Sequence, residues 1–280
     1  KTTLKNRPHW QLAATLVVAA CACTASAQLQ VFSEDFDTDR SADGTWLINV
    51  TPQGYSPVDL FFDYSSVGIP PAPNSAGTTR GLKLQANLDP LEQFFPSGSS
   101  ASPAGFSITE NFEMRWDWWL NFNGPLNGGG AGSTQIGGAG FGTAAVSAQV
   151  PTQIDSVFIG ASGDGTGTTA DYRVYTPAFS ASLQDASGVY AAGTVGSRNN
   201  THEYYQSTFP PVAAPPEQLA LYPQQTGETQ GGSAGMRWND ISLRKVGNII
   251  TYTINGLLIA TIDVSTNGFL GGANIVFGQF

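Results

Sequence analysis

The clearest hydrophobic pattern lies at the C-terminal end of the chain, where short runs of alternating apolar and polar residues follow one another. Three of these runs are Met236–Arg244, Asn248–Asn255 and Leu257–Val264, and Ala273–Phe280 is a fourth. The second and third are rich in Ile and Thr, and they are joined by Asn255-Gly256, a dipeptide that strongly favours a two-residue hairpin turn. The pattern therefore predicts a set of antiparallel strands.

Similar runs are spread over the rest of the chain and alternate with clusters of Gly, Pro, Asn and Asp. No amphipathic segment of three helical turns interrupts them. The further strands that we predict are Gln30–Asp37, Trp46–Asn49, Leu60–Asp63, Gly81–Asn87, Phe112–Asn123, Gln135–Phe141, Ser156–Gly160 and Asp171–Tyr175. About a dozen strands in one domain are typical of a two-sheet antiparallel jelly-roll β-sandwich, so we predict an all-β fold of this kind over residues 28–280.

Residues 176–234, which we call the excursion, lack this regular alternation of strand-like runs and turn clusters. The excursion has weak periodicity, two Pro-Pro pairs and an aromatic cluster that contains His202, Tyr204, Tyr205 and Phe209. Linkers between domains are poor in aromatic residues, and the strands that follow are too few to fold alone. We therefore predict a long, ordered loop region inserted between strands of one sandwich.

The first residues have the pattern of a leader. Three basic residues precede the apolar run 12–22, and Ala25-Ser26-Ala27 has the form of a cleavage site, so residues 1–27 are predicted to be a secretory signal peptide. The apolar run is shorter than the about 20 residues that a membrane-spanning helix needs. As an alternative to secretion, Val18-Ala19-Ala20-Cys21 resembles a bacterial lipobox, which would anchor a lipoprotein through Cys21.

Charge and cysteine content exclude several classes of function. Both cysteines, Cys21 and Cys23, lie in the leader, so the exported chain has no thiol for a disulfide, a thiolate metal site or a nucleophile. Without the three basic residues of the leader, nine of 12 Lys and Arg remain against 21 Asp and Glu, which is a net charge of −12. Nucleic acids are bound by clusters of Lys and Arg, so we expect no nucleic-acid partner.

The segment Phe112–Asn123 has the most regular alternation in the chain. Its apolar set is Phe112, Met114, Trp116, Trp118, Leu120 and Phe122, and the set between them is Glu113, Arg115, Asp117, Trp119 and Asn121. Because successive side chains of a strand point to opposite faces, the first set is predicted to face the other sheet and the second to lie on an outer face.

This outer face has the composition of a sugar-binding surface. An indole can support the apolar face of a sugar ring while amides and carboxylates bind its hydroxyl groups. The predicted ligand contacts are Arg115, Asp117, Trp119 and Asn121, with His202, Tyr204 and Tyr205 of the excursion as a wall. The alternative is that the excursion covers Trp119, which is then part of the core.

Several motifs resemble one known family. The strand Trp238-Asn-Asp-Ile-Ser-Leu, the hairpin Ile-Thr-Tyr-Thr-Ile-Asn-Gly256 and the final Ile275-Val-Phe-Gly look like the closing strands of the concanavalin A-like (laminin-G-like) jelly roll, and Glu34-Asp-Phe-Asp and Gly81-Leu-Lys-Leu are similar to its opening. The resemblance implies that fold. The superfamily includes lectins, carbohydrate-binding modules, glycoside hydrolases, polysaccharide lyases and proteins without a known ligand, so the fold leaves the function open.

Secreted bacterial proteins of this type often carry a dockerin or a sorting helix with a PEP motif after the sandwich. The sequence stops at Phe280, on the predicted last strand, so such a tail is expected to follow it. A dockerin would imply a partner in a substrate-degrading complex.

The glucanases of this superfamily carry carboxylates in an E-x-D-x-x-E strand motif. The nearest match here is Glu113-x-Arg115-x-Asp117, with Arg in place of the middle carboxylate. Glu113 and Asp117 are about 13 Å apart on an extended strand, which exceeds the about 9.5 Å that an inverting pair of carboxyl groups spans. These two residues therefore do not form a catalytic pair by themselves, although either can act with a residue of a neighbouring strand.

We therefore expect a secreted, non-catalytic module that binds carbohydrate or has a structural role at the cell surface. The alternatives are a glycoside hydrolase of the same fold, a polysaccharide lyase that uses His202 with Tyr204 or Tyr205, and an adhesive protein without a sugar site. A glycan or polysaccharide is the expected partner of the binding module, the hydrolase and the lyase, but not of the adhesive protein.

A calcium site is a separate alternative. Asp35-x-Asp37-x-Asp39, followed by Asp43-Gly44, resembles a loop of oxygen ligands, but it lacks the glycine at position six and the terminal Glu of an EF-hand. The same carboxylates suit the solvent face of a first strand and its turn. No cofactor is predicted, and bound Ca²⁺ stays an open alternative.

Overall fold

The structure, a computed structural model, describes residues 29–52, 54–89, 96–122, 135–165, 170–177, 181–266 and 270–280. All of the strands and helices named below belong to the unit Asp35–Phe280. The predicted signal peptide, with Cys21, lies outside the described residues. No described helix has the length and apolar character needed to cross a membrane.

Two antiparallel sheets face each other. The six-stranded sheet has the order β1 (Trp46–Thr51), β4 (Gly98–Pro103), β12 (Asn274–Gln279), β6 (Ile136–Thr143), β7 (Val157–Ser162) and β8 (Tyr172–Tyr175). The four-stranded sheet has the order β11 (Leu257–Asp263), β10 (Ile249–Ile254), β9 (Trp238–Val246) and β5 (Phe112–Trp119). A two-stranded sheet pairs β2 (Val58–Asp63) with β3 (Arg80–Leu84).

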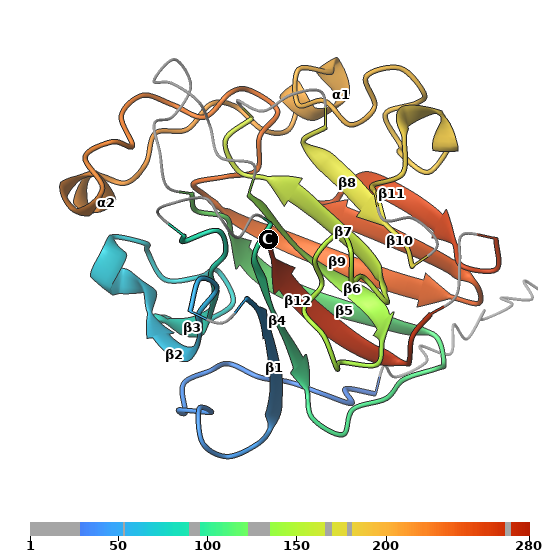
Figure 1. Ribbon diagram of the computed structural model, residues 1–280. Helices are drawn as coiled ribbons and strands as arrows, with labels where there is room; N and C mark the ends of the chain where they lie inside the picture. Colours follow the sequence, from blue (N-terminus) through green and yellow to red (C-terminus); the bar gives the residue numbers. More distant parts are fainter. Residues whose placement is uncertain are drawn as a thin grey trace, which may run out of the picture. The chain divides into compact units, whose positions relative to one another are not determined.

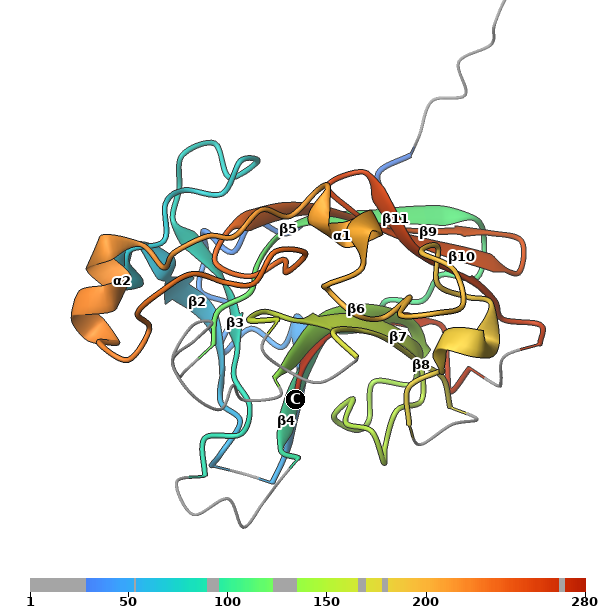
Figure 2. The same ribbon diagram turned by 90° about the horizontal axis from the view of Figure 1, so that it is seen from above.

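The six-stranded sheet lies in front in Figure 1, and Figure 2 shows the two large sheets as two layers. The last strand of the chain, β12, does not lie at an edge but between β4 and β6, so the chain crosses over from one sheet to the other before it ends. The predicted all-β, two-sheet jelly-roll sandwich with a long inserted loop region is confirmed.

One predicted strand is absent from the structure, and one observed strand was not predicted. No strand forms over Gln30–Asp37. At its end the Asp37 N–H donates to the side chain of Asp35 (Oδ1, 3.0 Å) and not to a neighbouring strand. The strand β4 was not predicted, since its sequence Gly-Ser-Ser-Ala-Ser-Pro has no alternation of apolar and polar residues. It is nevertheless buried throughout, because its hydroxyl groups find partners: Ser99 donates to the Gln85 carbonyl (2.8 Å) and Ser100 accepts from the Gln149 N–H (2.7 Å).

The main core lies between the two sheets and follows the period of two. In β10, the alternate residues Ile250, Tyr252 and Ile254 are almost fully buried, and they join a cluster with Val157 and Ile159 of β7. A second apolar cluster lies on the outer side of the six-stranded sheet, where the loop between β6 and β7 covers it. Its members are Ile136, Ala148, Val150, Ile154, Phe158, Tyr175, Val276 and Phe280.

The described residues of the excursion fold against the sandwich. It contains α1 (Glu203–Gln206), α2 (Pro216–Leu221) and a 3₁₀ turn at Asp185–Ser187; a further 3₁₀ turn, Tyr64–Val67, follows β2. The Ala191 N–H donates to the Ile259 carbonyl (3.0 Å) and the Thr261 N–H to that of Val189 (2.8 Å), so the excursion continues the sheet beyond β11. In Figure 2, α1 lies over the space between the two layers.

Glycine in β6 is required by the close approach of β7. A Cβ atom on Gly138 would overlap the carbonyl oxygen of Ile159 on the neighbouring strand, whereas one on Gly81 of β3 would make an ordinary contact at 3.4 Å with the Tyr64 ring. We predict that Gly138→Ala lowers the free energy of unfolding by about 1–3 kcal/mol or more, because backbone cannot move aside as a side chain can.

Gly81→Ala is the matched control for this prediction, since both glycines lie in strands and neither has a positive φ. Chemical denaturation of the two variants measures the difference. Equal stability of the two would show that β6 and β7 are not held at this separation.

Candidate functional site

The alternation of β5 places its polar residues on the outside of the four-stranded sheet, as predicted. Met114, Trp116 and Trp118 pack against the core between the sheets. Glu113 and Arg115, on the opposite face, are exposed. This outer face holds a hollow of about 370 Å³, which we call the β5–β9 hollow, lined by Asn74, Arg115, Trp116, Asp117 and Asp240.

Strand pairing brings two carboxylates together in this hollow. Asp117 of β5 lies directly opposite Asp240 of β9 in the antiparallel register. Residues directly opposite each other have Cβ atoms about 4.5–5.5 Å apart, so both carboxylates face the same small volume. Sequence spacing does not reveal this, because the two residues belong to strands far apart in the chain.

Arg115 supplies the positive charge of the hollow. Its Nη2 donates to Asp240 Oδ2 at 2.7 Å, and its Nη1 lies 3.7 Å from Glu113 Oε1. The hydrogen bond to Asp240 and that carboxylate's charge raise the pKa of Arg115 above its ordinary value. Its side chain is still 60% exposed, so the guanidinium keeps donors that a ligand can reach.

Asp117 is held by the loop between β2 and β3. The backbone N–H of Asn74 donates to Asp117 Oδ2 and the Asn74 side chain to Oδ1, both at 2.8 Å. The loop is itself fixed by Tyr64, whose hydroxyl accepts from the Ala72 N–H (3.1 Å) and donates to the Thr78 carbonyl (2.8 Å). The side of the hollow formed by this loop is therefore preformed.

Trp119 is not a free platform for a sugar ring, which corrects that part of the predicted site. Its indole packs edge-on against Trp238, with 5.7 Å between the ring centroids. It also packs against a cluster that includes Phe122 and Met236, to which the excursion contributes Val212, Ala214 and Leu219. The alternative interpretation, in which the excursion covers Trp119, is the one that the structure shows.

Asn121 also turns away from the hollow. Its Oδ1 accepts from the side-chain amide of Gln218 in α2 (2.7 Å), which is fully buried. Asn121 therefore helps to fix α2 against the end of β5, and it is not among the residues that line the hollow.

His202, Tyr204 and Tyr205 do not form a wall of this face, because α1 lies against β11, at the opposite edge of the sheet from β5. The Tyr204 hydroxyl donates to the Leu258 carbonyl (2.8 Å), and His202 Nδ1 accepts from the Tyr204 N–H and caps α1. Tyr205 is fully buried; its ring stacks on Tyr172, and its hydroxyl donates to the Ser197 carbonyl.

The acidic residues near the N-terminus bind their own turns. Asp39 Oδ1 accepts from the Ser41 N–H (2.8 Å) and Asp43 Oδ1 from the Thr45 N–H (2.9 Å). Hydrogen bonds from the side chains of Ser41 and Thr45, and then from these N–H groups, lower the pKa of the two carboxyls. Among the described residues, no group of three or more His, Cys, Asp and Glu is placed to hold a metal ion.

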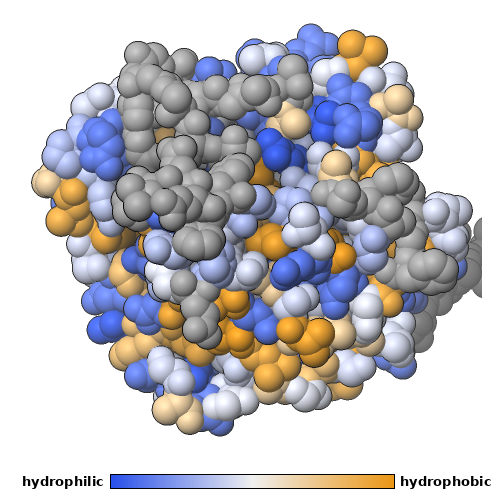
Figure 3. Space-filling model, viewed as in Figure 1, coloured by the Kyte–Doolittle hydropathy of each residue, from blue (hydrophilic) through white to orange (hydrophobic). Residues whose placement is uncertain are grey.

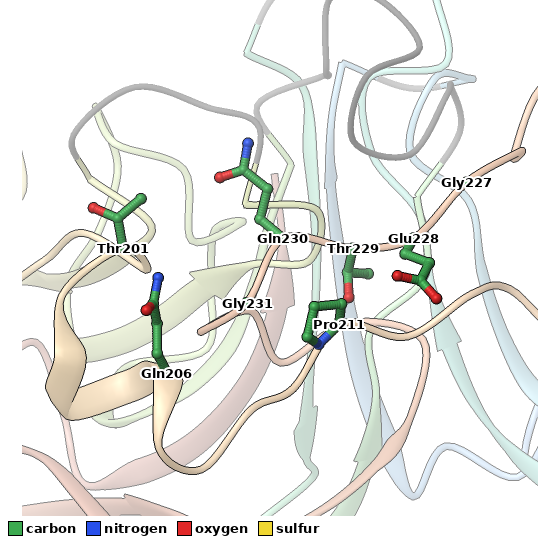
Figure 4. A pocket seen from close by; sticks show the side chains of 8 residues that line it. All are labelled: Thr201, Gln206, Pro211, Gly227, Glu228, Thr229, Gln230 and Gly231. Atoms are coloured by element: carbon green, nitrogen blue, oxygen red, sulfur yellow. The ribbon is translucent and has the colours of Figure 1, made fainter.

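A second hollow lies within the excursion. We call it the excursion pocket; its volume is about 510 Å³, and it is lined by Thr201, Gln206, Pro211, Gly227, Glu228, Thr229, Gln230 and Gly231. Figure 4 shows Thr201 and Gln206 on the α1 side, Pro211, Thr229 and Glu228 on the other side, and Gln230 between them. None of these residues was predicted from the sequence, since the segment has no motif or periodicity.

Sequence reasoning also missed Asn74 and Asp240 of the β5–β9 hollow. Asp240 had a usable signal, because Trp238, Asp240 and Ser242 alternate with buried residues in a predicted strand. Asn74 had none, since it reaches the hollow only through the folding of the β2–β3 loop.

No protein-family model and no curated protein matches this chain. Among solved structures, the chain is similar to a glycoside hydrolase family 16 endo-glucanase from Bacteroides ovatus in complex with G4G3G-2F-DNP. The identity is 12% and the TM-score 0.40, and the match covers 89% of this chain and 85% of that one. The fold stated above rests on the strand pairing of this chain.

The surroundings of Trp119 generate a prediction. Trp119→Ala should lower the free energy of unfolding by about 3 kcal/mol, the lower end for truncation of a large aromatic side chain, since the indole is only half-buried. Thermal or chemical denaturation measures this, and Thr261→Ala on the exposed face of β11 is the control, with an expected change within about 0.5 kcal/mol. A stable Trp119→Ala variant that loses glycan binding would instead identify the indole as a ligand platform.

Proposed function

We propose that this protein binds an extracellular polysaccharide without cleaving it, through the β5–β9 hollow. The observation that carries the proposal is the opposition of Asp117 and Asp240 across two strands, beside the exposed donors of Arg115 and the preformed wall at Asn74. The signal peptide that the sequence predicts supports this role, because an exported protein meets polysaccharide outside the cell.

The chemistry of the hollow suits a sugar. Carboxylates accept hydrogen bonds from hydroxyl groups, and a guanidinium donates to hydroxyl and ring oxygens. Adjacent acceptors and donors can therefore bind neighbouring hydroxyl groups of one sugar unit. The volume of about 370 Å³ lies within the about 300–1,000 Å³ that is usual for small-molecule sites.

The charges of the hollow favour an uncharged glycan. Arg115 is already paired with Asp240, so the two carboxylates that line the hollow, Asp117 and Asp240, outnumber its one cation. An anionic ligand would meet like charges at short distance, which costs binding free energy. Neutral polysaccharides are therefore preferred over uronate-containing or sulfated ones.

A glycoside hydrolase is the second candidate, because Asp117 and Asp240 are placed as a pair from neighbouring strands. Carboxyl groups about 5–5.5 Å apart are the arrangement of retaining enzymes. One member of such a pair must be a general acid, with a raised pKa. Here both carboxylates already accept hydrogen bonds, Asp117 from the two donors of Asn74 and Asp240 from Arg115. This arrangement suits the binding of hydroxyl groups better than the donation of a proton, so we favour binding over hydrolysis.

The proposal predicts that Asp240→Asn weakens binding to a neutral polysaccharide by about tenfold or more, since it removes a charged acceptor and the partner of Arg115. Affinity electrophoresis or depletion on insoluble polysaccharides measures the loss. Asp37→Asn is the matched control, because it removes one exposed carboxylate outside the hollow. Unchanged binding by a folded Asp240→Asn variant would place the glycan elsewhere.

Assays of product formation separate binding from catalysis. The proposal expects no reducing-sugar release and no unsaturated product from any polysaccharide that the wild type retains. Reducing-sugar release that is lost in both Asp117→Asn and Asp240→Asn would make the protein a hydrolase that uses this pair. No retention on any glycan would leave the adhesive, sugar-independent role.

A further inference from the structure

The excursion pocket has a wall that is fixed by the backbone. The Thr229 N–H donates to the Val212 carbonyl (2.8 Å), the Val212 N–H donates to Thr229 Oγ1 (3.0 Å), and the Gly232 N–H donates to the Phe209 carbonyl (2.7 Å). These bonds, together with the antiparallel bridge between Ala213 and Glu228, hold residues 209–213 beside residues 228–232, and we call this pair of segments the ladder. The pocket lies between this ladder and α1.

One buried residue, Asn200, holds the ladder through hydrogen bonds. Asn200 is 2% exposed, and its side-chain amide donates to the Gly231 carbonyl (2.9 Å) and to Gln230 Oε1 (3.2 Å). The Asn200 N–H in turn donates to Asp171 Oδ2 (3.0 Å). The position of Gln230 is thus fixed, and a ligand would not have to order this part of the wall.

The lining is polar, with a single formal charge. Gln206 and Gln230 offer amides, Thr201 a hydroxyl and Glu228 a carboxylate, whereas Pro211 and the glycines offer a small apolar surface. None of the described lining residues is Lys or Arg. In Figure 3, which is viewed from the side of the six-stranded sheet, hydrophilic and hydrophobic side chains are mixed at the upper right, and several hydrophobic ones gather below the centre.

We propose that the excursion pocket is a second binding site, which takes one saccharide unit that is uncharged or carries an amino group. Amides serve as both donor and acceptor, which matches hydroxyl groups. Glu228 attracts an ammonium group and repels a carboxylate, and the volume of about 510 Å³ is that of a small-molecule site. The pocket shares no lining residue with the β5–β9 hollow, so this site does not depend on the function proposed there.

Three monosaccharides that differ in one group test the proposal: glucose, glucosamine and glucuronate. Titration of the isotope-labelled protein, followed by NMR at a pH where the amine is protonated, should shift the signals of Gln206, Gln230 and Gly231. Glucosamine should bind about two- to fivefold more tightly than glucose, the range of an exposed ion pair, and glucuronate more weakly than glucose. Equal or tighter binding of glucuronate, or shifts that avoid the pocket, would overturn the proposal.

Two variants make the test specific. Glu228→Gln should abolish the preference for glucosamine over glucose while glucose still binds, and Gln206→Ala should weaken all three sugars; both side chains are exposed, so the fold should be retained. Asp240→Asn should leave these titrations unchanged, which separates failure of the hollow from failure of the pocket. A preference for glucosamine that survives in Glu228→Gln would contradict the assignment.

Discussion

The pairing of β5 with β9 is the constraint on which the candidate site depends. Its register sets Asp117 opposite Asp240, and two residues further along it sets Trp119 opposite Trp238. Side chains alternate between the faces of a sheet, so a slip of one residue would turn the carboxylates into the core and Trp116 and Trp118 out to solvent. The apolar set of β5 excludes that slip, because those rings pack between the sheets.

The hairpin after β10 contributes to the same arrangement. The Asn255 N–H donates to the Asp240 carbonyl (2.7 Å), and the Asp240 N–H donates to Asn255 Oδ1 (2.8 Å). Asn255 and Gly256 both have positive φ, the conformation that a tight turn of this kind requires. Asn255, one of the two residues that predict the hairpin from the sequence, therefore also fixes the backbone of Asp240.

The sequence predicts those features of the fold that follow from local pattern, and it misses those made by distant segments. Alternation located β5, β9 and β10 because one face of each is apolar. It missed β4, whose buried serines are satisfied by partners that only the fold supplies. Likewise, the alternation of side chains along β5 placed Arg115 and Asp117 on the outer face. It could not show that the excursion would pack against Trp119 and hydrogen-bond to Asn121.

Burial explains why the four-stranded sheet has an outer face that is free for a ligand, whereas the six-stranded sheet is covered. The strands β4, β6 and β7 are buried along their whole lengths, since the loop between β6 and β7 covers their outer side with Ala148, Val150 and Ile154. Every second residue of β9 is buried, whereas the residues between them are partly or fully exposed. A sheet with two apolar faces can only be core, and a sheet with one polar face has that face free for recognition. The hydrogen-bonding groups of the outer face thus follow from the asymmetry of the sandwich itself, and the β2–β3 loop converts a flat polar surface into a hollow by bringing Asn74 onto Asp117.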